Sequence, residues 1–463
     1  MDERELLRRT AEIAAGFLES LEERPVFPPA SVADLRAALG GPLPDGPGDA
    51  LRVVEELAAQ GERGVVGSPG GRYFGFVIGG ALPAALAADW LVSTWDQNAG
   101  LAVCGPAAAV AEEVAGEWLR ELFGLPATAS FAFVTGCQMA HATCLAAARH
   151  AVLDRVGWDV ERRGLQGAPP IRVLAGAQRH VTVDRALRLL GLGTASIREV
   201  AADDQGRMRP EALARALAED EGPAIVCAQV GEVNTGSIDP LPEIVQAARA
   251  AGAWVHVDGA FGLWAAASPA LRGRVAGVER ADSWATDAHK WLNAPYDCGM
   301  ALVAHPEPHR AAMGVQAAYL VQDPAAARDQ MDWTPEFSRR ARGVVVYAAL
   351  RALGRRGVAE LVEAAHARAR ALAAGVARLP GCELLNEVVL NQVLFRFADD
   401  DTTRRVLADV QASGEAWMSG TVWQGRPAIR LSVSNWRTSE RDVERTLAAF
   451  ERALAAASGS RAG

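Results

Sequence analysis

Residues 286–295 read TDAHKWLNAP, and Lys290 in this stretch is the one lysine among 463 residues. The other 46 of the 47 basic side chains are arginines. An ε-amine can lose its proton and attack a carbonyl carbon, whereas a guanidinium stays charged. A chain that uses arginine at every other basic position, yet keeps Lys290 between His289 and Trp291, is therefore expected to use that amine for chemistry. The alternative is a surface lysine left over from a coding bias toward arginine.

Composition narrows the class of protein. The length allows two or three domains with a large shared core. The formal net charge of −9 argues against nucleic acid and membrane partners, since both attract basic surfaces. Six cysteines without a CxxC pair or metal-ligand spacing predict reduced thiols and no metal site. The first 20 residues are typical of an amphipathic helix rather than a signal peptide, and no apolar run is long enough to span a bilayer. We expect a cytoplasmic protein.

Short apolar segments alternate with helical patterns between residues 70 and 355. Such alternation predicts an α/β domain with a mainly parallel sheet, in which functional residues gather in loops at the carboxyl ends of strands. The expected strands are SFAFVTG (130–136), IRVLAGA (171–177), AIVCAQV (224–230), AWVHVDGA (253–260) and CGMALVAH (298–305).

The pattern differs at both ends of this region, which predicts three parts. A helical segment is expected over 1–70, a large domain over 71–355 and a smaller α+β domain over 356–463. In the first part, Ser31 is expected to cap a helix that Gly40 ends.

The predicted small domain begins with a long alanine-rich helix. Its expected elements are that helix over 358–378, strands at 392–397 and 428–435, a helix from Ser439, and a disordered tail from residue 452.

Asp258 stands at the end of the apolar strand in AWVHVDGAFG (253–262). A buried carboxylate is costly unless it has a partner, and the protonated ring nitrogen of a cofactor would be a suitable one. The alternative is a helix cap or a structural ion pair.

The stretch FVTGCQMAHATCLAAARH (133–150) predicts a strand that turns at Gly136, Cys137 and Gln138 into a helix. Free N–H groups and the positive dipole end at such a junction can hold a phosphate. Strand–turn–helix units are common, and the chain has no Walker A or strand-linked GxGxxG pattern, so a nucleotide is not expected.

His180, in QRHVTVDRALRLLGLG (178–193), follows a predicted strand and opens an amphipathic helix. Its imidazole could lie flat on an aromatic ring, although a lone histidine is more often structural.

Together these stretches resemble the pyridoxal-phosphate-dependent decarboxylases of the aromatic amino acid and glutamate decarboxylase group, which have the aspartate aminotransferase fold. The pairing of HVDxA with DxHKW, in that order, is the most specific match. The similarity covers nearly the whole chain; further matching stretches are RPVFPPAS, RYFGFVIGG, DWLVSTWDQNAG and GEVNTGSIDP. The resemblance implies a fold type I enzyme with a mainly parallel seven-stranded sheet, and a homodimer with active sites at the subunit interface.

The resemblance also implies roles for individual residues. Lys290 would form the internal aldimine with pyridoxal 5'-phosphate, Asp258 would pair with the pyridinium nitrogen, and His180 would stack on the ring near the reacting carbon. Further cofactor contacts are implied at Gly136, Cys137, Gln138, Ala260, His289, Asn234 and Asp287, with Thr235 in the same loop as Asn234.

The implied reaction is decarboxylation of an L-amino acid, with aromatic ones as candidates, to an amine and CO2. Alternatives on the same scaffold are aminotransfer, retro-aldol cleavage and decarboxylation coupled to oxidative deamination; a catalytically silent protein is a further one. The family's proton-donating loop tyrosine is not evident, because Gln330 falls near its place and Tyr319 matches a different, structural tyrosine. Candidate substrate residues are Phe76, Trp95 and Asn98, while Arg430 and Arg437 are candidates for a second substrate carboxylate.

Overall fold

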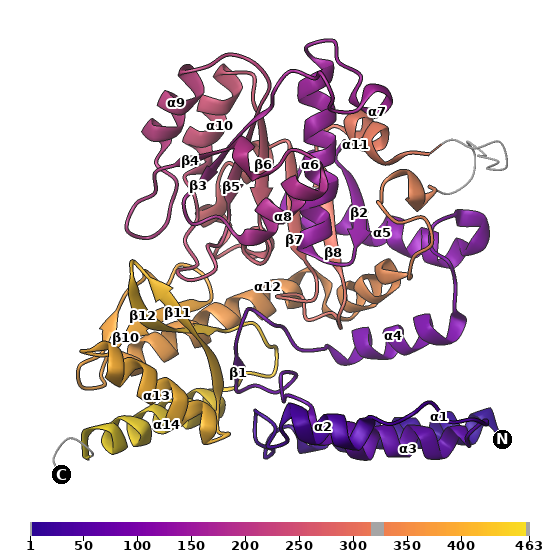
Figure 1. Cartoon of the computed structure of the whole chain (residues 1–463), viewed down its shortest axis with the longest axis vertical. Helices are drawn as coiled ribbons and strands as arrows, with labels where there is room; N and C mark the ends of the chain where they lie inside the picture. Colours follow the sequence, from indigo (N-terminus) through magenta and orange to yellow (C-terminus); the bar gives the residue numbers. More distant parts are fainter. Residues whose placement is uncertain (1, 316–327, 460–463) are drawn as a thin grey trace.

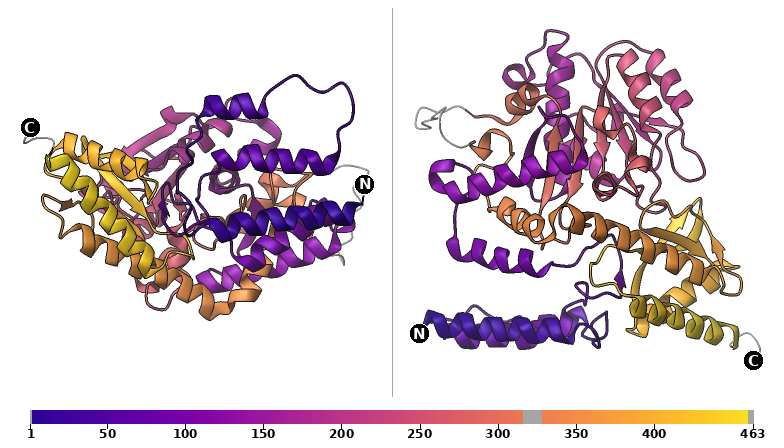
Figure 2. Two further views of the ribbon diagram at one scale, coloured as in Figure 1. Left: turned by 90° about the horizontal axis from the view of Figure 1, so that it is seen from below. Right: turned by 180° about the vertical axis from the view of Figure 1, so that it is seen from behind.

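The computed structural model describes residues 2–315 and 328–459. Figure 1 shows three bodies: a large sheet flanked by helices, a smaller sheet domain beside it, and a layer of helices from the N-terminal end of the chain below. The views in Figure 2 agree with this arrangement, and they show that the N-terminal layer lies against one side only of the rest.

The large domain is built on a seven-stranded sheet with the order β2-β8-β7-β6-β5-β3-β4. Only β8 runs antiparallel to its neighbours, so the sheet is mainly parallel, and the predicted fold class is confirmed. In sheet order the strands are β2 (Ser130–Val134), β8 (Gly299–Val303), β7 (Ser283–Asp287), β6 (Trp254–Asp258), β5 (Ala224–Gln229), β3 (Arg172–Gly176) and β4 (Ile197–Val200).

The five strands expected in this domain all occur, whereas β4 and β7 were not anticipated. β4 is a half-exposed edge strand of four residues, too short for a clear alternation. β7 has polar residues at buried positions, which hides the apolar run of a central strand. Ser283 and Thr286 are fully buried there because they bond to Trp254 Nε1 and the Ala260 carbonyl.

Helices cover both faces of the large sheet (Figure 1). The one that matters most for the site is α6 (Cys137–Asp154), whose alanine-rich sequence is buried nearly all round. The other helices of this domain are α4 (Pro83–Trp95), α5 (Pro106–Phe123), α7 (Val160–Arg163), α8 (Val181–Leu189), α9 (Pro210–Ala218), α10 (Leu241–Ala250) and α11 (Pro306–Met313). Short 3-10 helices lie at Glu62–Gly64, Ala102–Cys104, Thr194–Ser196, Gly262–Ala267, Arg272–Val275, Val278–Arg280 and Gln330–Asp332. No helix in the described ranges combines the length and the apolar character needed to cross a membrane.

The small domain has a five-stranded sheet with the order β1-β11-β12-β10-β9. Its edge strand β1 comes from residues near the N-terminal boundary of the predicted large domain and pairs in parallel with β11, far away in sequence. The strands are β1 (Tyr73–Phe74), β11 (Trp417–Trp423), β12 (Arg426–Ser432), β10 (Gln392–Arg396) and β9 (Glu383–Leu384), and the helices are α13 (Asp400–Ala412) and α14 (Glu440–Gly459).

One long helix, α12 (Arg342–Val376), joins the two domains and is broken at Gly354, which has φ 61°. The part of α12 that follows this break matches the helix predicted over 358–378 within a few residues at each end. The boundary expected after residue 355 falls next to the break, and the division at 70 and 355 stays a prediction. The tail predicted to be disordered is helical up to Gly459, because α14 continues through its alanine-rich end.

The N-terminal layer consists of α1 (Glu3–Ser20), α2 (Val32–Leu39) and α3 (Ala50–Gly61), and none of their residues is buried. Ser31 caps α2 through a reciprocal pair of bonds with Asp34, and Gly40 ends it, as predicted.

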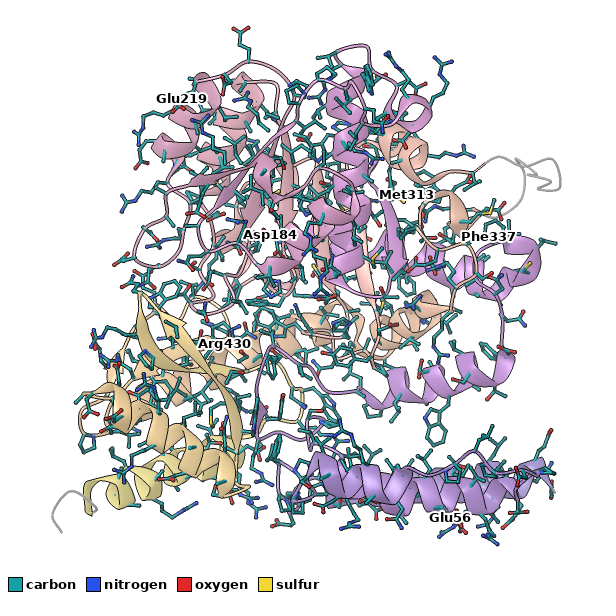
Figure 3. The ribbon with its side chains drawn as sticks, in the orientation of Figure 1. Glu56, Asp184, Glu219, Met313, Phe337 and Arg430 are labelled. Carbon is teal, nitrogen blue, oxygen red and sulfur yellow. The ribbon has the colours of Figure 1, made fainter. Side chains whose placement is uncertain are left out.

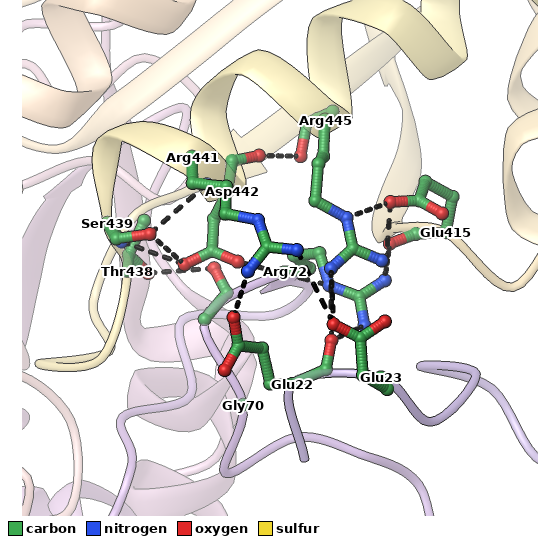
Figure 4. Close-up of polar contacts among 12 residues, drawn as sticks. Glu22, Glu23, Gly70, Arg72, Glu415, Thr438, Ser439, Arg441, Asp442 and Arg445 are labelled. Atoms are coloured by element: carbon green, nitrogen blue, oxygen red, sulfur yellow. Dashed lines mark hydrogen bonds and ion pairs between the residues drawn. The ribbon is translucent and has the colours of Figure 1, made fainter. Parts of the chain in front are cut away.

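Ionic contacts join this layer to the small domain (Figure 4). The Arg72 guanidinium donates to the carbonyls of Glu22 (2.9 Å) and Arg24 (3.1 Å). Arg441 of α14 pairs with the Glu22 carboxylate. The chain leaving α1 is thus tied to α14, while no residue of the three helices themselves is buried.

Candidate active site

The cavity that receives the predicted site residues lies where the parallel strands of the large sheet end, which is the usual place for a ligand in such sheets. It measures 250 Å³. Its lining residues are Phe76, Val77, Gly136, Cys137, Gln138, His180, Thr182, Gln229, Gly231, Val233, Asp258, Ala260, Phe261, Asp287, His289 and Lys290.

Lys290 stands in a turn directly after β7, with its side chain 20% exposed. Two neighbouring segments hold this turn. A Cβ at Gly79 would lie 2.0 Å from the Lys290 carbonyl oxygen, so only glycine allows that approach. Asn293 accepts hydrogen bonds from the backbone of Gly80 (2.6 Å) and Trp436 (3.0 Å), which locks the turn between the two domains.

The Lys290 amine faces a carboxylate. Its Nζ lies 3.1 Å from Asp287 Oδ2. Burial lowers the pKa of Lys290, but Asp287, with Cys137 and Asp258 behind it, outweighs burial and holds the pKa above its usual value. The amine is therefore an ammonium ion, which must lose a proton before it can attack a carbonyl.

Asp258 ends β6 and is buried, as expected for a carboxylate with a partner inside the protein. Its Oδ1 accepts a bond from the Ala260 amide (3.1 Å), and His141 Nε2 lies 3.5 Å from its Oδ2. Burial raises the pKa of Asp258, whereas His141, His180 and Lys290 lower it, and the pKa ends below the ordinary value. The side chain is thus a carboxylate at neutral pH.

His180 is the N-cap of α8. The Thr182 amide donates to its Nδ1 (3.4 Å), and Thr182 Oγ1 lies 2.8 Å from the same atom. A ring nitrogen that accepts from an amide carries no proton, so the proton of the neutral imidazole sits on Nε2. Burial lowers the pKa of His180, which keeps this imidazole neutral.

Another part of the cavity wall is the start of α6. Here the Cys137 amide donates to Asp287 Oδ1 (2.6 Å). Both polar atoms of the Gln138 side chain are buried and find no hydrogen-bond partner among the described residues. The Cys298 amide donates to His289 Nδ1 (3.2 Å), which leaves the proton of a neutral His289 on Nε2, beside this end.

The loop that contains Asn234 and Thr235 reaches the cavity, but through residues other than these two. Gly231 and Val233 line it. The Asn234 side chain turns toward the small domain instead, where its Oδ1 accepts from Thr421 (2.9 Å). Thr235 donates to the Gln205 carbonyl (2.8 Å).

Only Phe76 of the three predicted substrate residues lines the cavity. It is 60% exposed, and its φ of 57°, followed by 89° at Val77, is unusual for non-glycine residues. Trp95 is 51% exposed at the end of α4, away from the cavity of its own chain. Asn98 accepts from the Gly100 amide (3.0 Å) and supports a loop.

The two arginine candidates also lie elsewhere. Arg430 of β12, labelled in Figure 3, stands where the small domain faces the large one and donates to Asn234 Oδ1 (3.4 Å). Arg437 stacks on Trp436.

Gln330 does not line the cavity. It is buried in a short 3-10 helix, where Arg328 donates to its Oε1 (3.0 Å). Tyr319 lies outside the described residues. No tyrosine is found among the described residues that line the cavity.

Several site residues escaped the sequence analysis. Gln229 could have been found by the argument that identified Asp258, since it too ends an apolar strand. His141 lies behind Asp258, and no local pattern marks it, whereas alternation along the strand places His256 on the same face as Asp258. Trp417, which stacks on Phe76 at 5.6 Å, comes from the small domain and had no signal of its own.

Comparison with known proteins gives consistent matches. The family model described as the pyridoxal-dependent decarboxylase conserved domain matches residues 36–398. A tyrosine decarboxylase of Oryza sativa subsp. japonica is 30% identical, over 95% of this chain and 88% of its own length. An L-2,4-diaminobutyrate decarboxylase of Rhizobium meliloti (strain 1021) is 32% identical, over 80% and 75%. The crystal structure of Oryza sativa TDC with PLP and tryptamine matches with a TM-score of 0.91 at 25% identity and covers 98% of both chains.

Proposed function

Because the chain belongs to the pyridoxal-dependent decarboxylases, we propose that it removes the α-carboxylate of an aromatic L-amino acid and that Lys290 carries the cofactor. It is an amino-acid carboxy-lyase, and its cofactor is pyridoxal 5'-phosphate. The residue roles and the aromatic substrate are the proposed part. One observation carries them: the lone lysine of the chain faces a cavity that also receives Asp258 and His180.

The start of α6 fits the phosphate of the cofactor. A helix N-terminus offers free amides and a positive dipole end, and Gln138 adds an amide side chain that has no other partner among the described residues. His289 can donate from Nε2. A Cβ at Gly136 would come within 3.3 Å of the His289 ring, so glycine keeps the two segments close.

The middle of the cavity fits the ring. When bound, the cofactor supplies an electron sink for the bond that breaks at the substrate's Cα. Asp258, as a carboxylate, would hold a proton on the ring nitrogen. The neutral His180 would stack on one face, and its Nε2–H would be free to donate into the cavity. Ala260 is small enough to leave room for the ring's other face.

The mouth of the cavity supports an aromatic substrate. Phe76 lines it and stacks on Trp417, which also stacks on Tyr73 at 5.2 Å. The described lining residues contain no arginine, so a second substrate carboxylate has no cationic partner there other than Lys290. A flat apolar side chain suits this wall better than an acidic one.

We also propose a homodimer. The layer of α1–α3 has no buried residue, and an apolar groove of 570 Å³ runs between α1, α3 and α4. Ile13, Phe17, Leu57 and Trp90 are among its lining residues. A second copy of the chain would cover these side chains, because a two-fold axis applies the same patch twice. In such a dimer, the exposed side chain of Trp95 and the nearby Asn98 would contact the second copy of the chain.

A second candidate reaction on the same site is decarboxylation followed by oxidative release of an aldehyde. It is favoured by one observation, the lack of a tyrosine among the described residues of the cavity lining. A cytoplasmic location, supported by scattered cysteines without a CxxC pair, stays a prediction.

Product analysis tests the proposal. The purified holoenzyme is incubated with aromatic, acidic and basic aliphatic L-amino acids, and CO2, amine, aldehyde and hydrogen peroxide are measured. We expect CO2 and amine in equal amounts from an aromatic substrate. Aldehyde with peroxide would support the second candidate, turnover of acidic or aliphatic substrates alone would refute the aromatic assignment, and no turnover would support a silent protein. Borohydride reduction and peptide mapping test the site separately, with Lys290 expected as the modified residue.

A further inference from the structure

A chain of buried polar side chains leads away from Asp258 into the core, on the side opposite the cavity. Trp254, His256 and Asp258 alternate along β6 and therefore share one face of the sheet. His141 of α6 reaches this face and lies between His256 and Asp258. Both histidines are fully buried, and neither lines the cavity.

The contacts run without a gap. His141 Nε2 lies 3.5 Å from Asp258 Oδ2, and its Nδ1 lies 2.8 Å from His256 Nε2. His256 Nδ1 lies 3.0 Å from Ser283 Oγ, which accepts from Trp254 Nε1 at 2.9 Å.

The two ends fix the direction of every hydrogen bond between them. The indole N–H of Trp254 can only donate, and an ionised carboxylate can only accept. With both imidazoles neutral, Ser283 donates to His256 Nδ1, His256 Nε2–H donates to His141 Nδ1, and His141 Nε2–H points at Asp258. Each group is then satisfied, and no unpaired charge is buried apart from that of Asp258.

This direction matters for Asp258 because burial alone raises the pKa of that carboxyl. An apolar side chain at position 141 could fill the same space, so packing alone does not require a histidine there. His141 instead supplies a donor at the carboxylate, while burial lowers the pKa of His256 to about 3 and keeps that ring neutral.

We propose that His141, backed by His256, Ser283 and Trp254, is a positioning residue that keeps Asp258 ionised and so keeps a proton on the ring nitrogen of the cofactor. The inference rests on the proposed role of Asp258. It adds a buried relay that has no contact with substrate.

The same histidine nitrogen also lies 3.5 Å from Cys137 Sγ, and the Cys137, His141 and Asp258 donor atoms lie within 4.8 Å of one another. A metal ion would need a lone pair on His141 Nε2, whereas the relay places a hydrogen there. Metal analysis of the purified holoenzyme is therefore part of the test, and a stoichiometric metal that is lost in His141→Met would overturn the relay.

The main readout is the 15N chemical shift of the ring nitrogen in holoenzyme loaded with 15N-labelled pyridoxal 5'-phosphate, which reports its protonation directly. We expect the wild-type shift to be that of a protonated nitrogen. His141→Met should move it toward the unprotonated value and lower turnover by about 10–100-fold, by analogy with the loss of a group that orients a metal-binding residue. His141→Gln, which keeps an N–H donor near the carboxylate, should restore much of the shift.

Matched variants separate the relay from simple packing. Thr143→Val alters a buried polar residue two positions further along α6, bonded only within the helix, and should leave the shift unchanged. Ser283→Ala removes a remote member of the relay and should move the shift in the same direction as His141→Met, to a smaller extent; it decides the matter if His141→Met fails to fold. An unchanged shift in both His141→Met and Ser283→Ala would refute the inference.

Asp258→Asn separates this inference from the proposed function. If Asp258→Asn moves the 15N shift and the His141 and Ser283 variants do not, the relay is wrong and the role of Asp258 holds. If Asp258→Asn also leaves the shift unchanged, the assignment of Asp258 fails and the relay fails with it. A cofactor analogue with C–H in place of the ring nitrogen should remove the difference in turnover between wild type and His141→Met.

Discussion

The residues around Lys290, Asp258 and His141, here called the cavity floor, and the N-terminal helical layer differ in how their side chains are buried. Around Lys290, Asp258 and His141, charged and polar groups are buried with partners from β6, β7 and α6 of the same chain. In α1–α3 no residue is buried, although the helices carry apolar stripes. The groups of the first region find their partners within one chain, whereas the second region leaves apolar side chains exposed, and we propose that a second copy of the chain covers them. Perturbing each region should therefore change different properties of the protein.

The largest expected effect is on chemistry at the cavity floor. Lys290→Arg keeps the positive charge opposite Asp287 but cannot become a neutral amine. Turnover should fall by at least about 10³-fold, as when a covalent catalytic group is lost, while the circular dichroism spectrum stays unchanged. Borohydride should no longer attach the cofactor to the protein. Activity close to wild type would refute the role of Lys290 outright.

The next effect is on assembly and belongs to the helical layer. Leu57→Asp and Trp90→Asp place carboxylates in the apolar groove, and a two-fold axis doubles each change. Since burying one such side chain is worth about 1.5–3 kcal/mol, the dimer should weaken by at least about a hundredfold, measured by analytical ultracentrifugation.

The matched control for assembly is Val156→Asp, an exposed apolar residue that follows α6 and does not line the groove. It should leave the dimer intact. The proposed interface would be contradicted if all three variants dissociated equally, or if none of them dissociated.

A smaller effect is expected on cofactor loading. Asp287→Asn keeps an acceptor for the Cys137 amide but removes a negative charge beside the proposed phosphate site, so the cofactor should bind roughly tenfold tighter. In the wild type, attachment should accelerate as pH rises, because carboxylates hold the pKa of Lys290 above its usual value and the neutral amine is scarce. The variant lowers that pKa, so the rise should move to lower pH. Absorbance titrations measure the affinity for the cofactor, and stopped-flow traces measure the rate of its attachment at each pH. Looser binding of the cofactor to the variant would contradict the placement of the phosphate.

The smallest effect concerns the exposed layer itself. Ser31→Ala removes the side-chain cap of α2 and should cost about 1 kcal/mol of local helix stability. Hydrogen exchange of the amides in 32–36 should accelerate, while turnover stays the same. Ser31→Asp, which keeps an acceptor, should exchange like the wild type, and a change in turnover would show that the layer and the cavity are coupled.

The sequence was most informative where a residue's chemistry is local. Asp258 and Gly136 were identified because each ends an apolar strand, and Lys290 because of its singularity; all three line the cavity. Asn234, Trp95 and Asn98 do not line it in this chain, because the direction of a side chain in a loop or at a helix end depends on contacts with other segments. β7 was missed because its buried polar residues have partners in other segments, Ser283 in β6 and Thr286 in the loop that follows β6.

What the sequence determined by itself is the class of fold and the reactive residue type, since hydrophobic periodicity and the singularity of Lys290 are local properties of the chain. The tertiary structure decided which groups surround them. His141 from α6, Ser283 from β7 and Trp254 from β6 form one relay only because the sheet and its covering helix bring residues 29 and 115 positions apart within 3 Å. Likewise, the apolar sides of α1–α3 became an interface prediction only when the fold left them uncovered. Long-range contacts of this kind have no signature in a sequence, because their partners are chosen by packing.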